Sequence, residues 1–225
     1  MSLLTTATAT GRHNRGTDAV AGAGPNRLGR QVWALGTVYG PRASAELAAE
    51  ITRRAAEEAS RTGAIEAVLL AARCVPTVPV EMAQDHRRDV DAWVTVVQTC
   101  PDRPAEGYDV AWAGDCRASH LTEHGQWQQV AGTWHRTRCE QHPDTRTPSL
   151  GGVVCSDDVG SRQVPIPYTR LVLTSPGVHS TLTYNELEMF GREHSPWDAA
   201  QRLVTAASQL GGQESTAVVV ARAHG

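Results

Sequence analysis

Residues 108–118 read YDVAWAGDCRA. The run Tyr108–Trp112 is rich in aromatic and β-branched residues and is followed by turn residues, which predicts a strand. Two further short runs of this kind, Ala92–Gln98 and Gln126–Val130, lie on either side of it. Short strands in succession, separated by turn residues, predict a mostly antiparallel sheet in the middle of the chain.

Outward from this sheet, the sequence predicts helices toward both ends. Upstream, a strand at Gln31–Val38 precedes a helix at Ser44–Arg61, where apolar residues recur every four positions, and a second helix at Ala64–Arg73. Strands in the middle with helices near both ends favour an α+β fold over the strict alternation of a Rossmann fold. The elements predicted downstream are a strand at Tyr168–Thr174, a helix that a capping box at Thr183 opens and that runs to Phe190, a helix at Pro196–Leu210 and a strand at Ala217–Ala221.

The 225 residues suffice for one sizeable domain, and no internal repeat or long linker divides them. We expect a disordered leader at residues 1–10 and one domain at residues 11–225. The leader lacks the basic start and the long apolar stretch of a signal peptide. The polar segment Thr133–Gln163 shows no periodicity, so we expect a loop or an insertion there.

All 21 basic residues are arginine, against 24 acidic residues, and the formal net charge is −3. The absence of lysine points to an Arg-biased genome and excludes a Walker P-loop, a Schiff base and a Ser-Lys dyad. A nearly neutral chain lacks the basic footprint of a general nucleic-acid binder, and no apolar run is long enough to span a membrane. No Cys-x-x-Cys pair occurs among the cysteines, so we expect reduced thiols and a cytoplasmic location.

Two generic motifs, a glycine-rich stretch and a His/Cys cluster, give only weak evidence for a ligand site. The glycines of Gly22–Gly29 have the wrong spacing for a dinucleotide-binding loop, and a strand rather than a helix follows them. His135, Cys139 and His142 offer three candidate zinc ligands, whereas a structural site usually has four ligands and a paired cysteine. A polar surface loop is therefore the preferred interpretation of that cluster.

Several segments resemble the protein phosphatase 2C family, the metal-dependent PPM-type phosphatases, and they occur in the family's order along the chain. The opening stretch is similar to the family signature V-A-x-V-G-D-S-R-A, with Cys116 in place of the serine. The resemblance covers about Arg12 to Ala221. The other segments that carry it are Asn14–Ala19 (N-E-D-A in the family), Trp33–Glu50 (D-G-H-G-G), His124–Val130 (the second hairpin), Tyr168–Phe190 (S-D-G) and Gly211–Ala221 (G-G-x-D-N).

This resemblance implies a four-layer α/β/β/α sandwich, in which two antiparallel sheets are flanked by helix pairs. It also implies hydrolysis of phosphoserine and phosphothreonine by two Mg²⁺ or Mn²⁺ ions that share a nucleophilic water, while an arginine holds the phosphate. Two dications about 4 Å apart repel each other by about 16 kcal/mol at an effective dielectric constant of about 20. Such a centre therefore needs several carboxylate ligands.

Most of the family's metal-binding carboxylates fall on other residue types in this sequence. The resemblance puts Thr17, Tyr39 and Pro176 at three primary carboxylate positions, and it puts Ser180 at a further acidic position. Glu214 is the one conservative replacement. The residues left for a metal are Asp18, Gly40, Asp115 and Glu214, and the candidate contacts for a phosphate or a partner are Arg12, His13, Arg15 and Arg42.

Two functions remain open. The first is a pseudophosphatase, a regulatory module without catalytic residues or cofactor that binds a protein such as a phosphoprotein or a kinase. Its expected binding surface is the cleft between Asn14–Asp18, Tyr39–Arg42 and Ser175–Ser180. We expect neither a nucleic-acid nor a membrane partner. The alternative is an active phosphoserine/phosphothreonine phosphatase with a rebuilt Mg²⁺ or Mn²⁺ site on Asp18, Asp115 and Glu214.

Overall fold

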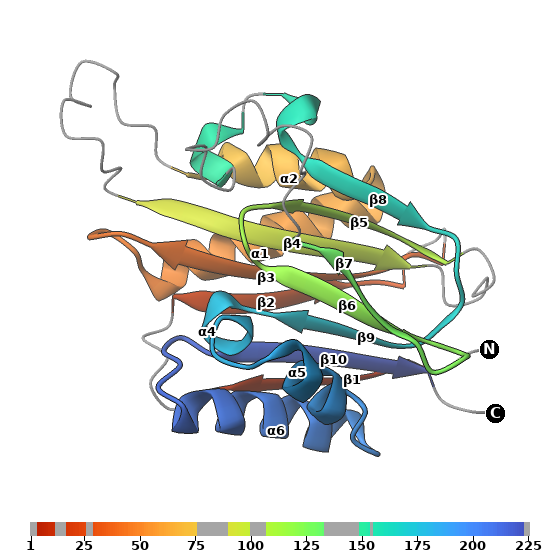
Figure 1. Cartoon of the computed structure of the whole chain (residues 1–225). Helices are drawn as coiled ribbons and strands as arrows, with labels where there is room; N and C mark the ends of the chain where they lie inside the picture. The colour runs from red at the N-terminus through yellow and green to blue at the C-terminus, as the bar shows by residue number, and fades with distance from the viewer. Residues whose placement is uncertain are drawn as a thin grey trace, which may run out of the picture.

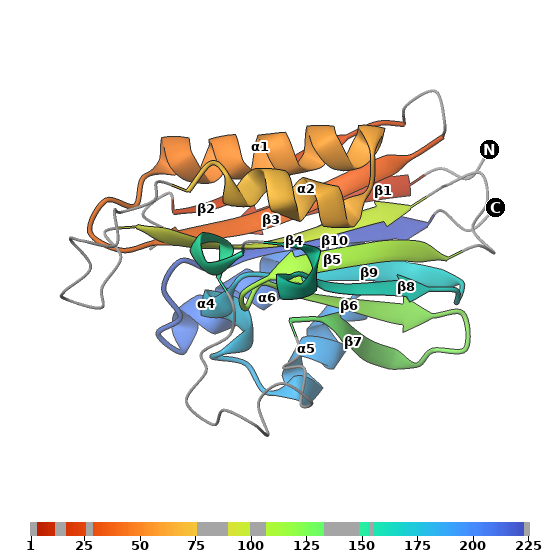
Figure 2. The ribbon, with the colours of Figure 1, turned by 90° about the horizontal axis from the view of Figure 1, so that it is seen from above.

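The structure is a computed structural model that describes residues 4–11, 17–25, 29–75, 90–99, 107–132, 149–153 and 155–222. Within these ranges the chain forms two five-stranded antiparallel sheets that pack face to face, with helices on the outer face of each (Figures 1 and 2). The predicted fold class, an α+β sandwich of two antiparallel sheets flanked by helices, is confirmed.

The first sheet has the strand order β1-β10-β9-β6-β7. Helix α6 covers its outer face, where Leu203 and Ala207 of the helix pack against Val219 of the sheet. The strands are β1 (Leu4–Thr10), β6 (Arg117–Thr122), β7 (Trp127–Ala131), β9 (Tyr168–Thr174) and β10 (Thr216–Arg222), and the helices on this side are α4 (Pro176–His179), α5 (Tyr184–Gly191) and α6 (Pro196–Gln209).

The second sheet has the strand order β2-β3-β4-β5-β8. Two helices cover its outer face, and two short 3₁₀ turns lie in the connection between β7 and β8 (Figure 2). The strands are β2 (Asp18–Ala23), β3 (Gln31–Tyr39), β4 (Asp91–Thr99), β5 (Tyr108–Ala113) and β8 (Gly160–Val164), the helices are α1 (Ala45–Arg61) and α2 (Ala64–Ala72), and the 3₁₀ turns are η3 (Leu150–Gly152) and η4 (Ser156–Asp158).

Helix α1 shows how the local sequence builds the outer layer. The hydroxyl of Ser44 accepts a hydrogen bond from the backbone amide of Leu47 at 3.2 Å and so caps the helix. The buried side of the helix is mostly alanine, with Ile51 and Thr52 among the larger residues. Such small side chains allow a close approach to the sheet, and a Cβ atom on Gly36 would lie 2.8 Å from Thr52. The helix therefore fixes where β3 runs.

The central core lies between the two sheets. Trp33 and Leu35 of β3 meet Leu173 of β9 and Val218 of β10 in one buried cluster. Burial of these side chains on two facing sheets provides the main free energy that holds the sandwich together. The ends of β3 and β4 in one sheet are thereby fixed relative to the ends of β9 and β10 in the other.

Two expectations about segments were wrong. Residues 4–10, which belong to the expected disordered leader, form β1, and β1 pairs with β10 from Leu4↔Arg222 to Thr10↔Thr216. The segment Thr133–Gln163, where we expected a loop or an insertion without regular structure, contains η3, η4 and most of the edge strand β8. The three central residues of β8 are exposed, so its polar sequence gives no apolar alternation. Residues 133–148, with the candidate zinc ligands, lie outside the described part.

The remaining predicted strands and helices match the observed elements to within one residue at each end. No helix in the described ranges has the length and apolar character needed to cross a membrane. Of the cysteines, Cys74, Cys116 and Cys155 lie in the described ranges, and each of them is a free thiol.

Candidate functional site

A pocket lies where the end of β3 and the start of β4 meet α4 and the loop before β10. Its volume is about 350 Å³. Four positions that the sequence singled out, Tyr39, Pro176, Ser180 and Glu214, line this one cavity. The other lining residues are Thr37, Trp93, Gly177, Thr181, Gly211, Gly212 and Gln213.

One wall of the pocket is aromatic. The rings of Tyr39 and Trp93 have centroids 4.7 Å apart and planes tilted by 47°. Gly114 also lies directly against the indole: its φ is 83°, and a Cβ atom there would lie 1.9 Å from Trp93 Cδ1. Because Trp93 contacts both a ring and a backbone turn, the aromatic wall is fixed in place.

The opposite wall is clamped to the first sheet by Ser175. Its hydroxyl donates a hydrogen bond to the backbone oxygen of Glu214 at 2.8 Å and accepts one from the amide of Thr216 at 2.9 Å. Pro176 follows at the first position of α4, where a missing amide proton costs nothing. Gly177 lies directly against the backbone of residues 213 and 214. These contacts hold Pro176 and Glu214 beside each other in the pocket lining.

Asp18 lies behind the pocket and not in its lining. Its Oδ1 accepts a hydrogen bond from the hydroxyl of Thr37 at 2.7 Å, and its buried Oδ2 has no hydrogen-bond partner among the described residues. Burial raises the pKa of Asp18 to about 6, the hydroxyls of Thr37, Ser175 and Thr216 oppose this shift, and the charge of Glu214 adds to it. The two carboxylates therefore interact electrostatically.

Replacing Asp18 by asparagine is expected to raise the free energy of unfolding at neutral pH. The folded chain holds the Asp18 proton with a pKa of about 6 and the unfolded chain with the ordinary 3.8. Ionised Asp18 therefore lowers stability above about pH 6 and has no such effect below about pH 4. We expect Asp18→Asn to be more stable by about 1–3 kcal/mol at about pH 7.5, and equal to the parent near pH 4.

Urea unfolding at the two pH values measures this difference. Glu123→Gln, at a carboxylate whose side chain is 53% exposed, is the matched control and should change stability little at either pH. A loss of stability in Asp18→Asn at neutral pH would show that the carboxylate is favourably held.

Asp115 interacts with Arg117 and His179 outside the pocket lining. It lies in the turn between β5 and β6, with Oδ1 3.3 Å from Arg117 Nε and Oδ2 3.4 Å from the buried His179 Nε2. Burial alone would raise the pKa of Asp115, but His179 and Arg117 outweigh it and hold the pKa below its ordinary value. Asp115 thus stabilises the turn and does not line the pocket.

The other predicted positions that lie in the described ranges, Thr17, Gly40 and Arg42, do not line the pocket. Thr17 is buried, with only 8% of its surface exposed, and its hydroxyl has no hydrogen-bond partner among the described residues. Gly40 forms the turn after β3 with a φ of 110°, and Arg42 lies on the exposed segment before α1. Arg12, His13 and Arg15, together with Asn14 of the expected cleft, lie outside the described residues.

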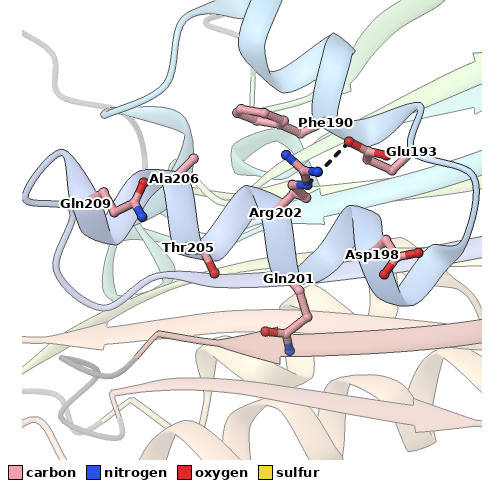
Figure 3. Close-up of a pocket in the computed structure, with 8 residues that line it drawn as sticks. All are labelled: Phe190, Glu193, Asp198, Gln201, Arg202, Thr205, Ala206 and Gln209. Carbon is pink, nitrogen blue, oxygen red and sulfur yellow. Dashed lines mark ion pairs between the residues drawn. The ribbon is translucent and has the colours of Figure 1, made fainter.

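A second, larger hollow of about 580 Å³ lies over α5 and α6 (Figure 3). Its lining mixes both charges, and Arg202 lies 3.5 Å from Glu193 there. No position that the sequence singled out lines it. Glu193 in this hollow is therefore a suitable control position for variants of the first pocket.

The donor set of the first pocket does not fit a two-metal centre. Within the described ranges, no three His, Cys, Asp or Glu side chains lie close enough together to hold a metal ion. Glu214 is the only acidic side chain among the described lining residues, and Thr37 separates Asp18 from the cavity. Mg²⁺ and Mn²⁺ need several oxygen ligands, which this lining does not supply.

Solved structures with the same architecture cover the whole chain. The PPM Ser-Thr phosphatase MsPP from Mycobacterium smegmatis, solved with cacodylate, is 23% identical, with a TM-score of 0.68 over 98% of this chain and 99% of its own. The chain has the fold of the PPM-type Ser/Thr phosphatases. The catalytic domain of the phosphatase PstP, in complex with two manganese ions, is 19% identical with a TM-score of 0.68 and full coverage of both chains.

The Ser/Thr phosphatase Stp1 from Staphylococcus aureus is 16% identical, with a TM-score of 0.68 over 100% of this chain and 96% of its own. No protein-family model matches the sequence, and no curated protein does either. The resemblance of the sequence to PPM-type phosphatases is thus confirmed for the fold. At these identities the likeness shows the fold alone.

One residue of the pocket, Trp93, lies outside every segment that carries the sequence resemblance. Trp93 of β4 is paired directly with Thr37 of β3 in the sheet register. The only signal for Trp93 was its place in a predicted strand. Its position against Tyr39 follows from the register, which the strand pattern alone does not give.

Proposed function

We propose that this chain is a pseudophosphatase, a PPM-type fold without phosphatase activity that binds a protein partner as a regulatory module. The observation that carries the proposal is the lining of the pocket. Tyr39, Pro176 and Ser180 stand there at positions where the family resemblance calls for carboxylates. A regulatory role fits a fold that is kept while the ligands for its chemistry are lost.

The chemistry of these three side chains supports the proposal. A phenol with an ordinary pKa near 10 is a poor bridging ligand, proline has no side-chain donor, and a serine hydroxyl carries no charge. The repulsion between two neighbouring dications then lacks the anionic charge that would offset it. Without a stable pair of ions there is no activated water to attack phosphorus.

One observation favours the alternative, an active phosphatase with a rebuilt metal site. The charge of Glu214 contributes to the raised pKa of Asp18, so the two carboxylates lie in the same region of the fold. Asp115, the third member of that set, is held by Arg117 and His179 instead. A single ion on two carboxylates would lack the clamp on the attacking and leaving oxygens. We therefore prefer the inactive form.

Hydrolysis assays with an aryl phosphate and a phosphopeptide in the presence of Mn²⁺, alongside calorimetric titration of Mn²⁺, test the proposal. We expect no turnover above buffer and no stoichiometric binding of the metal. Turnover that disappears in Glu214→Ala would overturn the proposal and support the rebuilt site. Glu193→Ala, at the α5–α6 hollow, controls for an unspecific loss of activity.

The partner we propose is a protein, such as a phosphoprotein or a kinase, in the cytoplasm. Arg42, which follows Tyr39 by three residues, is exposed on the segment between β3 and α1. We propose that its guanidinium contacts an anionic group of the partner. The simpler alternative is that Arg42 is an ordinary surface residue.

A further inference from the structure

The first pocket combines aromatic faces with negative charge. Tyr39 and Trp93 form one wall, and Glu214 is the only charged side chain among the described lining residues. The carboxylate of Asp18 lies one hydrogen bond behind Thr37, close enough to Glu214 for their charges to interact. None of the described lining residues is arginine or histidine. The potential inside the cavity therefore favours a cation.

Three hydroxyl groups of the lining donate their protons to the protein itself and not into the cavity. Thr37 donates to Asp18 at 2.7 Å, Ser180 donates to the backbone oxygen of Pro176 at 2.5 Å, and Thr181 donates to that of Gly177 at 2.9 Å. These donors are already used within the protein, so they are not available to a phosphate or carboxylate in the cavity. An anion in the cavity would meet the Glu214 carboxylate, and these three hydroxyl groups would not offset the repulsion.

We propose that this pocket binds the guanidinium group of an arginine side chain presented by a partner protein. The inference rests on the proposed function, because it names the chemistry by which the partner is recognised at the same pocket. A guanidinium can lie on the Tyr39–Trp93 wall while it donates two parallel hydrogen bonds to the Glu214 carboxylate.

Arginine suits the pocket better than a simple ammonium ion. The guanidinium is planar, stacks on aromatic faces and is more weakly hydrated than an ammonium group. A cavity of about 350 Å³ has room for this group and part of its methylene stem.

The probe for the test is N-acetyl-arginine methylamide, titrated calorimetrically into the full chain at low salt with a chelator present. We expect a dissociation constant on the order of 1 mM, as befits a single side chain. The citrulline analogue has nearly the same shape without the charge, and it should bind at least about tenfold more weakly.

Three variants locate the binding. Glu214→Gln should weaken arginine binding at least about tenfold, and Tyr39→Leu at least about fivefold, because they remove the charge and the aromatic face respectively. Tyr39→Phe keeps the ring and should stay within about twofold of the parent. Glu193→Gln makes the same charge change at the α5–α6 hollow and should leave binding unchanged.

Equal binding of the arginine and citrulline probes, no measurable binding of either, or full binding by a folded Glu214→Gln variant would each overturn the inference. The Mn²⁺ phosphatase assay, run on the same preparation, separates this failure from that of the proposed function. Turnover overturns the proposed function whatever the arginine result. A protein that shows no phosphatase turnover and does not bind the arginine probe overturns only the proposed guanidinium site.

Discussion

A chain carrying Tyr39→Asp, Pro176→Asp and Thr17→Glu together is expected to bind Mn²⁺ at least about a hundredfold more tightly than the parent chain. Positions 39 and 176 line the same pocket as Glu214, so the variant gathers three carboxylates around one cavity. The third change adds a carboxylate next to Asp18. Calorimetric titration of Mn²⁺ measures the gain.

The fold should accept the two changes in the pocket lining. Position 176 is the first residue of α4, where an acidic side chain is favoured by the helix dipole. Loss of the Tyr39 ring removes its contact with Trp93, at a cost of about 0.5–1.5 kcal/mol. Because Thr17 is buried, the double variant Tyr39→Asp/Pro176→Asp is the fallback if the triple variant unfolds.

The matched control is Tyr39→Asn, Pro176→Asn and Thr17→Gln, which has the same shapes without the charges and should bind no more Mn²⁺ than the parent. Circular dichroism establishes that each variant is folded. A folded acidic variant with the metal affinity of its amide control would mean that these positions do not meet around one ion, and the site assignment would be wrong.

Replacement of Gly177 by alanine is expected to lower the free energy of unfolding by about 2–4 kcal/mol. A Cβ atom at this position would lie 1.9 Å from the backbone oxygen of Gln213 and 2.7 Å from that of Glu214. Both obstacles are backbone, so no side-chain rotation relieves them. The loop before β10 would have to move away from α4, and the hydrogen bonds of Ser175 would be strained with it.

Gly152→Ala is the control, because nothing lies within 4 Å of a Cβ atom at that glycine. Its free energy of unfolding should match the parent within about 0.5 kcal/mol. Urea unfolding of both variants gives the comparison. If Gly177→Ala proved as stable as Gly152→Ala, the close contact between α4 and the 213–214 backbone would not exist in solution.

The sequence predicted the elements whose residues show a strong pattern. Helix α1 has an apolar side at four-residue spacing and a serine cap, and strand β9 has a run of buried leucine and valine. Strand β1 lacks such a signal, since it buries only small residues such as Ala7 and Ala9 between exposed positions. Its partner β10 lies at the other end of the sequence, so no local pattern could indicate the pairing.

The order of the family motifs along the sequence predicted which residues of the candidate site lie at the family's metal-binding positions. The resemblance singled out Tyr39, Pro176 and Glu214, and these three residues line one cavity. The motifs did not predict how the neighbouring side chains pack around the cavity. Thr37 stands between Asp18 and the pocket, and Asp115 turns to His179. Such contacts depend on register and side-chain direction, which short motifs do not encode.

The pairing of β1 with β10 has a consequence for synthesis. Ala9 lies opposite Ala217 in the sheet, so their chain separation is about two hundred residues. On the ribosome, residues 4–10 emerge long before the strand they pair with, and β1 stands at the edge of its sheet next to β10. Strand β1 is therefore made long before it can be placed, and closure of this long loop makes completion of the sheet a late, slow step in folding.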